Sequence, residues 1–141
     1  MISSINAHGY GLSWFENIRV DGLVTFIEHE ILPKRPIAGD PDQFSQLHGL
    51  DAGDLDGDGL DDFVTGKTFW THNGTDPGAR DPAVLYAFLT RRTASGVQFI
   101  RQRVDSSAGI GRQVVVRDLN GDGRAEIFVG NKKGASLFRN R

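Results

Sequence analysis

The chain has 141 residues, with 16 lysine and arginine residues, 18 aspartate and glutamate residues, a formal net charge of −2 and no cysteine. Disulfide bonds, zinc–thiolate sites and cysteine nucleophiles are therefore excluded. The basic residues are scattered and form no stripe, which argues against nucleic-acid binding. No apolar run approaches the roughly 18 residues that a membrane-spanning helix needs.

The strands expected from the sequence are short segments in which bulky residues alternate with polar ones, as in half-buried β-strands. Segments at equivalent places along the chain resemble each other, so that 26–32 matches 99–104 and 46–53 matches 110–117. In chain order the expected strands cover residues 2–5, 11–17, 26–32, 46–53, 84–89, 99–104, 110–117, 127–130 and 134–140.

An aspartate-rich loop follows the expected strand at 46–53. Its carboxylates fall at loop positions 1, 3, 5 and 9, and position 7 offers only a backbone carbonyl. Oxygen ligands at every second residue suit Ca²⁺, which takes 6–8 oxygens at about 2.3–2.6 Å. The glycines at 57 and 59 let the chain reverse so that the side chains converge. The predicted ligands are Asp54, Asp56, Asp58, Leu60 and Asp62.

The same loop returns 64 residues later, with Asp118, Asn120, Asp122, Arg124 (through its carbonyl) and Glu126 as the predicted ligands. An EF-hand loop would close with a glutamate at position 12. Position 12 is Thr65 in one copy and Val129 in the other, and β-branched residues flank the loops, so each loop is expected to join two strands of a hairpin. The open alternative is a pair of metal-free turns held by aspartate side chains.

Three of the four histidines are expected on the molecular face opposite these loops. The long, turn-rich connection 67–83 lies at the same end, and long loops on a rigid scaffold often bind ligands. Aromatic faces with polar neighbours suit sugars, whereas imidazoles suit a metal or acid–base chemistry. The alternative is that each histidine merely satisfies a backbone group or faces water. The candidate ligand-binding residues are His8, Tyr10, His48, Lys67, Trp70, His72 and Arg112.

Residues 54–66 and 118–130 resemble the loops of the FG-GAP or VCBS repeat family, the β-propellers with calcium loops that include the integrin α-subunit head. Residues 7–16 and 67–86 look closer to bacterial VCBS proteins, with the propeller of fungal aldos-2-ulose dehydratases a more distant likeness. The resemblance implies an all-β fold of β-propeller blades, each a four-stranded antiparallel meander, with bound Ca²⁺. It also implies an extracellular or periplasmic location, although no signal sequence is visible.

The strand order predicts about two blades, cut mid-blade at both ends. Residues 1–44 are expected to form a partial blade, 45–108 a blade with the first calcium loop, and 109–141 a partial blade with the second. Propellers usually close with about 4–8 blades. Two blades therefore need the rest of a longer propeller chain, which is the favoured expectation, a homo-oligomer that completes a ring, or pairing between the terminal halves.

Two functions from different classes follow. The first is a calcium-binding propeller segment that acts as a binding or interaction module for carbohydrate or protein. The second is part of a sugar-active, lyase-like enzyme with a histidine-lined site opposite the calcium loops. A transition metal held by His8, His48 and His72 would favour the enzyme, whereas calcium at the loops alone would favour the module. The sequence shows no Ser–His–Asp arrangement, phosphate loop or zinc spacing.

Overall fold

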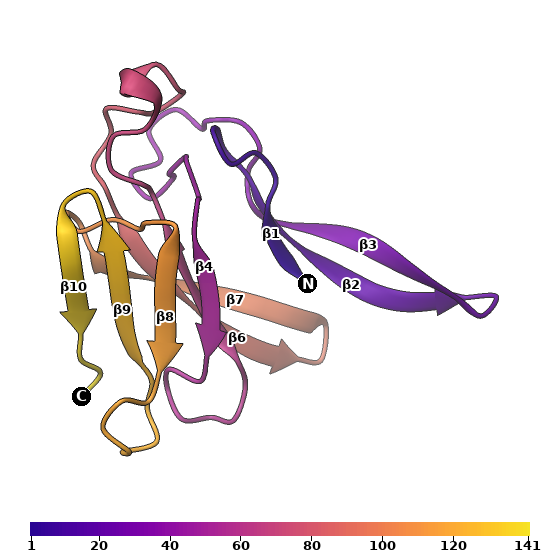
Figure 1. Cartoon of the computed structure of the whole chain (residues 1–141). Coiled ribbons are helices and arrows are strands. Elements are labelled where there is room, and N and C mark those ends of the chain that lie inside the picture. The colour runs from indigo at the N-terminus through magenta and orange to yellow at the C-terminus, as the bar shows by residue number, and fades with distance from the viewer.

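The computed structural model describes residues 1–141 and is all-β, as predicted, with ten strands in three antiparallel sheets (Figure 1). No helix in it is long and apolar enough to cross a membrane. The strands are β1 (Ile2–Ser4), β2 (Leu12–Val20), β3 (Leu23–Leu32), β4 (Leu50–Gly53), β5 (Asp62–Gly66), β6 (Leu85–Thr93), β7 (Gly96–Asp105), β8 (Gln113–Arg117), β9 (Glu126–Asn131) and β10 (Gly134–Phe138), and a short 3₁₀ turn, η1 (His72–Gly74), precedes β6.

The middle sheet is a four-stranded meander in the order β4-β5-β6-β7, the strand arrangement of a propeller blade. It lies within the unit expected at residues 45–108. A three-stranded sheet, β1-β2-β3, precedes it, and a second one, β8-β9-β10, follows. The two terminal sheets are separate and do not pair with each other, so the chain does not join its own terminal halves.

Alternation along the central strands directs large side chains to both faces of the middle sheet. On β6, Leu85, Ala87 and Leu89 point to one face, whereas Tyr86 and Phe88 point to the other. β5 is buried along its whole length. A strand with both faces covered is typical of the interior of a layered structure.

Two hydrophobic clusters hold the three sheets together. One cluster joins the middle sheet to the C-terminal sheet through residues such as Val64, Ile127 and Val129. The other joins it to the N-terminal sheet through residues such as Leu12 and Phe63. The middle sheet is therefore covered on both sides, whereas the outer part of the β2–β3 hairpin projects away from the rest of the molecule (Figure 1).

Two predicted strands begin later than expected. The prediction of strand at residues 46–49 was wrong, because Gln46 has a left-handed backbone with φ of 60° and its amide donates to the carbonyl of Gly9. The prediction was also wrong at 110–112, where Ile110 forms only an isolated bridge with Thr68. Both segments instead tie neighbouring sheets together near the histidines.

Candidate functional site

The first aspartate loop joins β4 to β5 and is organised by its first residue. One carboxylate oxygen of Asp54 accepts from the amide of Gly57 at 2.7 Å, and the other accepts from Gly59 at 2.9 Å. Both glycines have positive φ, which lets the loop turn back on itself. The hydrogen bond from Gly59, aided by that from Gly57, holds the pKa of Asp54 below its ordinary value.

Three carboxylates of this loop converge. Asp54, Asp56 and Asp58 each offer an oxygen, and the three oxygens lie within 4.8 Å of one another. The fourth predicted ligand, Asp62, is fully buried at the start of β5 and accepts from the amides of Leu55 at 3.0 Å and Thr90 at 2.8 Å. Burial raises its pKa. Asp62 thus braces the base of the loop and lies outside the group of three.

A cation of the chain itself already contacts these carboxylates. Arg91, on β6, forms an ion pair with Asp58 at 3.0 Å and another with Asp56. Arg91 was not predicted at this loop, because it lies 33 residues from Asp58 along the chain and only the pairing of β5 with β6 brings it close.

The second loop, between β8 and β9, repeats this geometry. Asp118 accepts from Gly121 at 2.6 Å and from Gly123 at 2.9 Å, which are the positions that Gly57 and Gly59 hold in the first loop. Asn120 replaces the second aspartate, and its amide donates to Asp122 at 2.9 Å and to Glu126 at 3.1 Å. An uncharged donor therefore lies among the carboxylates of this loop.

The two loops lie next to each other at the same end of the molecule (Figure 1). The amide of Ala125 donates to the carbonyl of Asp54 at 3.1 Å. The converging carboxylate oxygens of the first loop are hard ligands of the kind that calcium prefers. The first loop supplies four of the predicted carboxylates and the second supplies three.

The histidines gather at the opposite end of the fold. His8 lies in the β1–β2 connection, His48 just before β4, and His72 in η1 of the β5–β6 connection. The ring centres of His8 and His72 are 4.1 Å apart and stacked, and that of His48 lies 5.4 Å from His8 and 6.4 Å from His72. Burial, followed by the nearby His8 and His72, lowers the pKa of His48.

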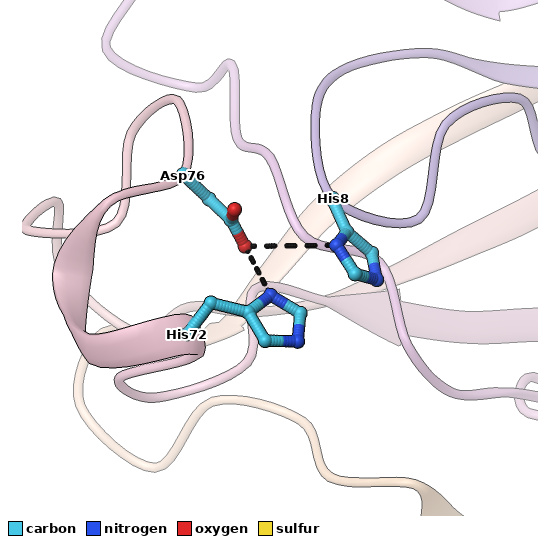
Figure 2. Close-up of side chains that lie close together, drawn as sticks. All are labelled: His8, His72 and Asp76. Carbon is cyan, nitrogen blue, oxygen red and sulfur yellow. Dashed lines mark hydrogen bonds and ion pairs between the residues drawn. The ribbon is translucent and has the colours of Figure 1, made fainter.

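Asp76 completes this histidine cluster and was not identified from the sequence. Its Oδ2 lies 2.6 Å from Nδ1 of His72 and 3.9 Å from Nδ1 of His8 (Figure 2). The contact with His72 lowers the pKa of Asp76. The four-residue separation of His72 and Asp76 was the available signal, but it indicates contact only once a helical turn is known to occur there.

A cavity of about 550 Å³ adjoins the cluster, and its lining contains no carboxylate and no hydrophobic side chain. His48 Nε2 and Thr68 Oγ1, both among the lining residues, are buried atoms without a hydrogen-bond partner. Orphaned buried polar atoms are rare in folded proteins, and these two are shielded from solvent behind the cavity wall. The lining residues are His48, Thr68, Thr71, His72, Gly111, Arg112, Gly130, Asn131 and Lys132.

Besides His8, three further candidate residues, Tyr10, Lys67 and Trp70, lie outside this lining. Lys67 is buried, its ammonium donates to Gln46, Thr68 and Ala79 at 3.2–3.4 Å, and burial lowers its pKa. Burial also raises the pKa of Tyr10. Trp70 is 43% exposed, and its carbonyl accepts from Lys132, a lining residue, at 2.9 Å.

Part of the chain matches a known protein family. Residues 48–80 match the model of the FG-GAP repeat, and they contain the first aspartate loop, β5 and η1. No solved structure matches the chain. The match supports the predicted relation to the FG-GAP family over this part of the chain. The segment that carries the first aspartate loop is therefore similar to an FG-GAP repeat.

Proposed function

We propose that the chain is a calcium-binding segment of a propeller-type protein and acts as a binding or interaction module. The observation that carries this proposal is the convergence of the Asp54, Asp56 and Asp58 oxygens within 4.8 Å, in a segment that matches the FG-GAP repeat. Calcium would be held there by these oxygens together with the carbonyl of Leu60, and Asp62 would join them only by turning an oxygen from the amides of Leu55 and Thr90 towards the ion.

The second loop would hold calcium through Asp118, Asn120, Asp122, the carbonyl of Arg124, and Glu126. Its affinity should be lower, because Asn120 is neutral and ligand charge helps to set calcium affinity. Calcium bound only to the folded state stabilises it by RT ln(1 + [L]/Kd), about 2.7 kcal/mol at 100-fold saturation. The melting temperature should therefore rise with calcium and fall with a chelator.

Calorimetric titration tests this proposal on two loop variants. Asp56→Ala should remove the tighter calcium site, and Asp122→Ala should remove the weaker one. Asp61→Ala is the matched control, because Asp61 lies in the first loop but is not a predicted ligand. If the titrations show no heat of binding and the melting temperature does not change with chelator, the loops are metal-free turns and the proposal is wrong.

The ligand of the module would bind at the cavity opposite the loops. The cavity offers cationic and hydroxyl groups, and the exposed Trp70 stands beside Lys132 at its edge, which suits a carbohydrate or a polar protein segment. The relation to VCBS repeats and an extracellular or periplasmic setting belong to the same proposal. Binding to a panel of oligosaccharides, compared between the wild type and Arg112→Ala, tests it, and equal binding by both would argue against this cavity.

A second candidate function is a sugar-active, lyase-like enzyme. Its specific support is the grouping of three histidines and Asp76 beside a polar cavity, since imidazoles serve as acids and bases near neutral pH. Such an enzyme would release unsaturated sugar products, and His48→Ala would abolish their formation. If sugars bind but no product forms, the enzyme hypothesis is wrong and only the binding-module hypothesis remains.

A further inference from the structure

The contact between two histidines and one carboxylate at the end of the fold opposite the aspartate loops has the composition of a metal centre. Nδ1 of His72 lies 2.6 Å from Oδ2 of Asp76, and Nδ1 of His8 lies 3.9 Å from the same oxygen (Figure 2). One ligand atom from each of the three residues falls within 4.8 Å of the other two. We propose that His8, His72 and Asp76 bind a divalent transition-metal ion of the zinc type.

The chemistry of the donors selects this class of ion. Imidazole nitrogen suits zinc, copper, nickel and iron, whereas calcium and magnesium prefer oxygen alone. Bonds of about 2.0–2.2 Å to a tetrahedral zinc place neighbouring ligand atoms roughly 3.3 Å apart. The distances of 2.6 Å and 3.9 Å lie on either side of that value, so shifts of about 1.5 Å or less would bring the three ligands around one ion.

Hydrogen bonds orient Asp76 and the loop that carries His8. The hydroxyl of Thr71 donates to Oδ2 of Asp76 at 3.4 Å. The amide of His8 donates to the side chain of Asn6 at 3.1 Å, and the carbonyl of Gly9 accepts from the amide of Gln46 at 2.8 Å. Such outer contacts orient metal ligands and strengthen binding.

Three protein ligands leave one position of a tetrahedral ion free for water or a ligand. His72 is part of the lining of the cavity of about 550 Å³, so this free position adjoins a space that can hold one. His48 lines the same cavity, and its Nε2 is buried without a partner.

The site would also connect separate parts of the fold. His8 belongs to the β1–β2 connection, whereas His72 and Asp76 belong to the β5–β6 connection. A metal ion between them would fix the N-terminal sheet to the middle sheet. The site is independent of the aspartate loops, which lie at the other end of the molecule (Figure 1), so its metal can be tested with the loops saturated.

The test is a zinc titration of the tag-free 141-residue chain by calorimetry in saturating calcium. We expect one zinc ion per chain, with affinity reduced at least tenfold in His8→Ala, in His72→Ala and in Asp76→Asn, since each substitution removes a ligand or its charge. His29→Ala is the control, because His29 stacks on Trp14 and contacts Glu16, away from the cluster. Cobalt should give the visible absorption of a tetrahedral ion in the wild type but not in His72→Ala.

Melting curves in calcium without zinc show whether each variant is folded, and only folded variants are compared. Failure of the folded wild type to bind zinc, or equal zinc affinity in all three cluster variants and the control, would overturn the proposal. Asp56→Ala separates this outcome from that of the calcium proposal, because it should lose calcium at the first loop and keep the zinc site.

Discussion

At the scale of single residues, Arg91 would compete with a metal ion for the carboxylate oxygens of the first loop. Its guanidinium pairs with Asp56 and Asp58, two of the three converging aspartates. A guanidinium cannot lose its charge in a protein, so calcium binding must either displace it or share these oxygens with it. The sequence contains this competitor but gives no sign of its position.

Replacing this arginine should therefore tighten calcium binding. We expect Arg91→Gln to increase the affinity of the first loop by about two- to fivefold, which corresponds to the strength of an exposed ion pair. Arg92→Gln is the matched control, because Arg92 is exposed and has no partner in the loop. Calorimetry measures both, and an unchanged or lower affinity in Arg91→Gln would show that Arg91 does not compete.

A second feature at this scale is a hydrogen-bond network that links the β3–β4 connection to β6 and β7. Asp42 accepts a hydrogen bond from Tyr86 at 2.7 Å and pairs with Arg103, which also donates to Tyr86 at 2.8 Å. The hydrogen bond from Tyr86, followed by that from Arg103, lowers the pKa of Asp42 below its ordinary value. The stabilisation is present above the pKa of the unfolded chain and is lost as the pH falls through the lowered value.

We expect Asp42→Asn to lower the melting temperature at pH 7, and we expect the difference from the wild type to shrink as the pH falls below the ordinary aspartate pKa. Asp21→Asn serves as the control, because Asp21 lies in the exposed β2–β3 turn with φ of 50°, which asparagine tolerates. Thermal melts across this pH range measure the difference. A gap between wild type and Asp42→Asn that stays constant with pH would contradict a role for the charge.

At the scale of elements, the two aspartate loops share one backbone geometry but carry different numbers of carboxylates. Their backbone hydrogen bonds correspond, since Asp54 and Asp118 accept from glycines at the same loop positions. What differs is the third loop position, where Asn120 donates to Asp122 and Glu126. The amide avoids the repulsion that a fourth carboxylate at this position would create without a metal.

Asn120→Asp should therefore lower the stability of the metal-free chain and raise the calcium affinity of the second loop. We expect a lower melting temperature in chelator, because a fourth carboxylate then joins Asp118, Asp122 and Glu126, and tighter calcium binding at the second loop. The reverse substitution in the first loop, Asp56→Asn, should weaken binding there. Melting curves with and without calcium measure both effects, and equal shifts in the two conditions would exclude a role for metal.

The elements also show where sequence patterns fail. Alternation predicted the strands that pack in the sheets, because burial of one face requires that pattern. It failed at residues 46–49 and 110–112. Apolar and polar residues also alternate there, but the backbone forms hydrogen bonds with segments that connect other strands. The contacts of Asp76 and Arg91 were likewise not predictable, since they depend on how a loop folds and on which strands are neighbours.

At the scale of the whole molecule, the C-terminal sheet leaves an apolar row on its outer face. Val115, Phe128 and Leu137 lie side by side on β8, β9 and β10 and are between 41% and 47% exposed. Adjacent exposed apolar residues often mark a contact surface. The predicted blade count and the completion of a ring by further chain or further copies remain predictions, because the fold shows three sheets and no closure.

We expect this row to make the isolated chain associate with itself as its concentration rises. Phe128→Lys should shift the chain towards a monomer, because a charged side chain in the row resists burial in a contact. Ile37→Lys is the control, since Ile37 is exposed at 52% in a loop away from the row. Light scattering measures the mass, and a wild-type monomer at all concentrations would rule out this contact.

The double coverage of the middle sheet has a consequence for how the molecule opens. Amide hydrogens exchange with solvent at rates set by local opening, and segments with few buried apolar contacts open most easily. β5 and β6 lie between two hydrophobic clusters, whereas the tip of the β2–β3 hairpin has neither face covered. Exchange monitored by mass spectrometry should thus be slowest in β5 and β6 and fastest at residues 18–26, so that the chain unfolds from its outer sheets inwards.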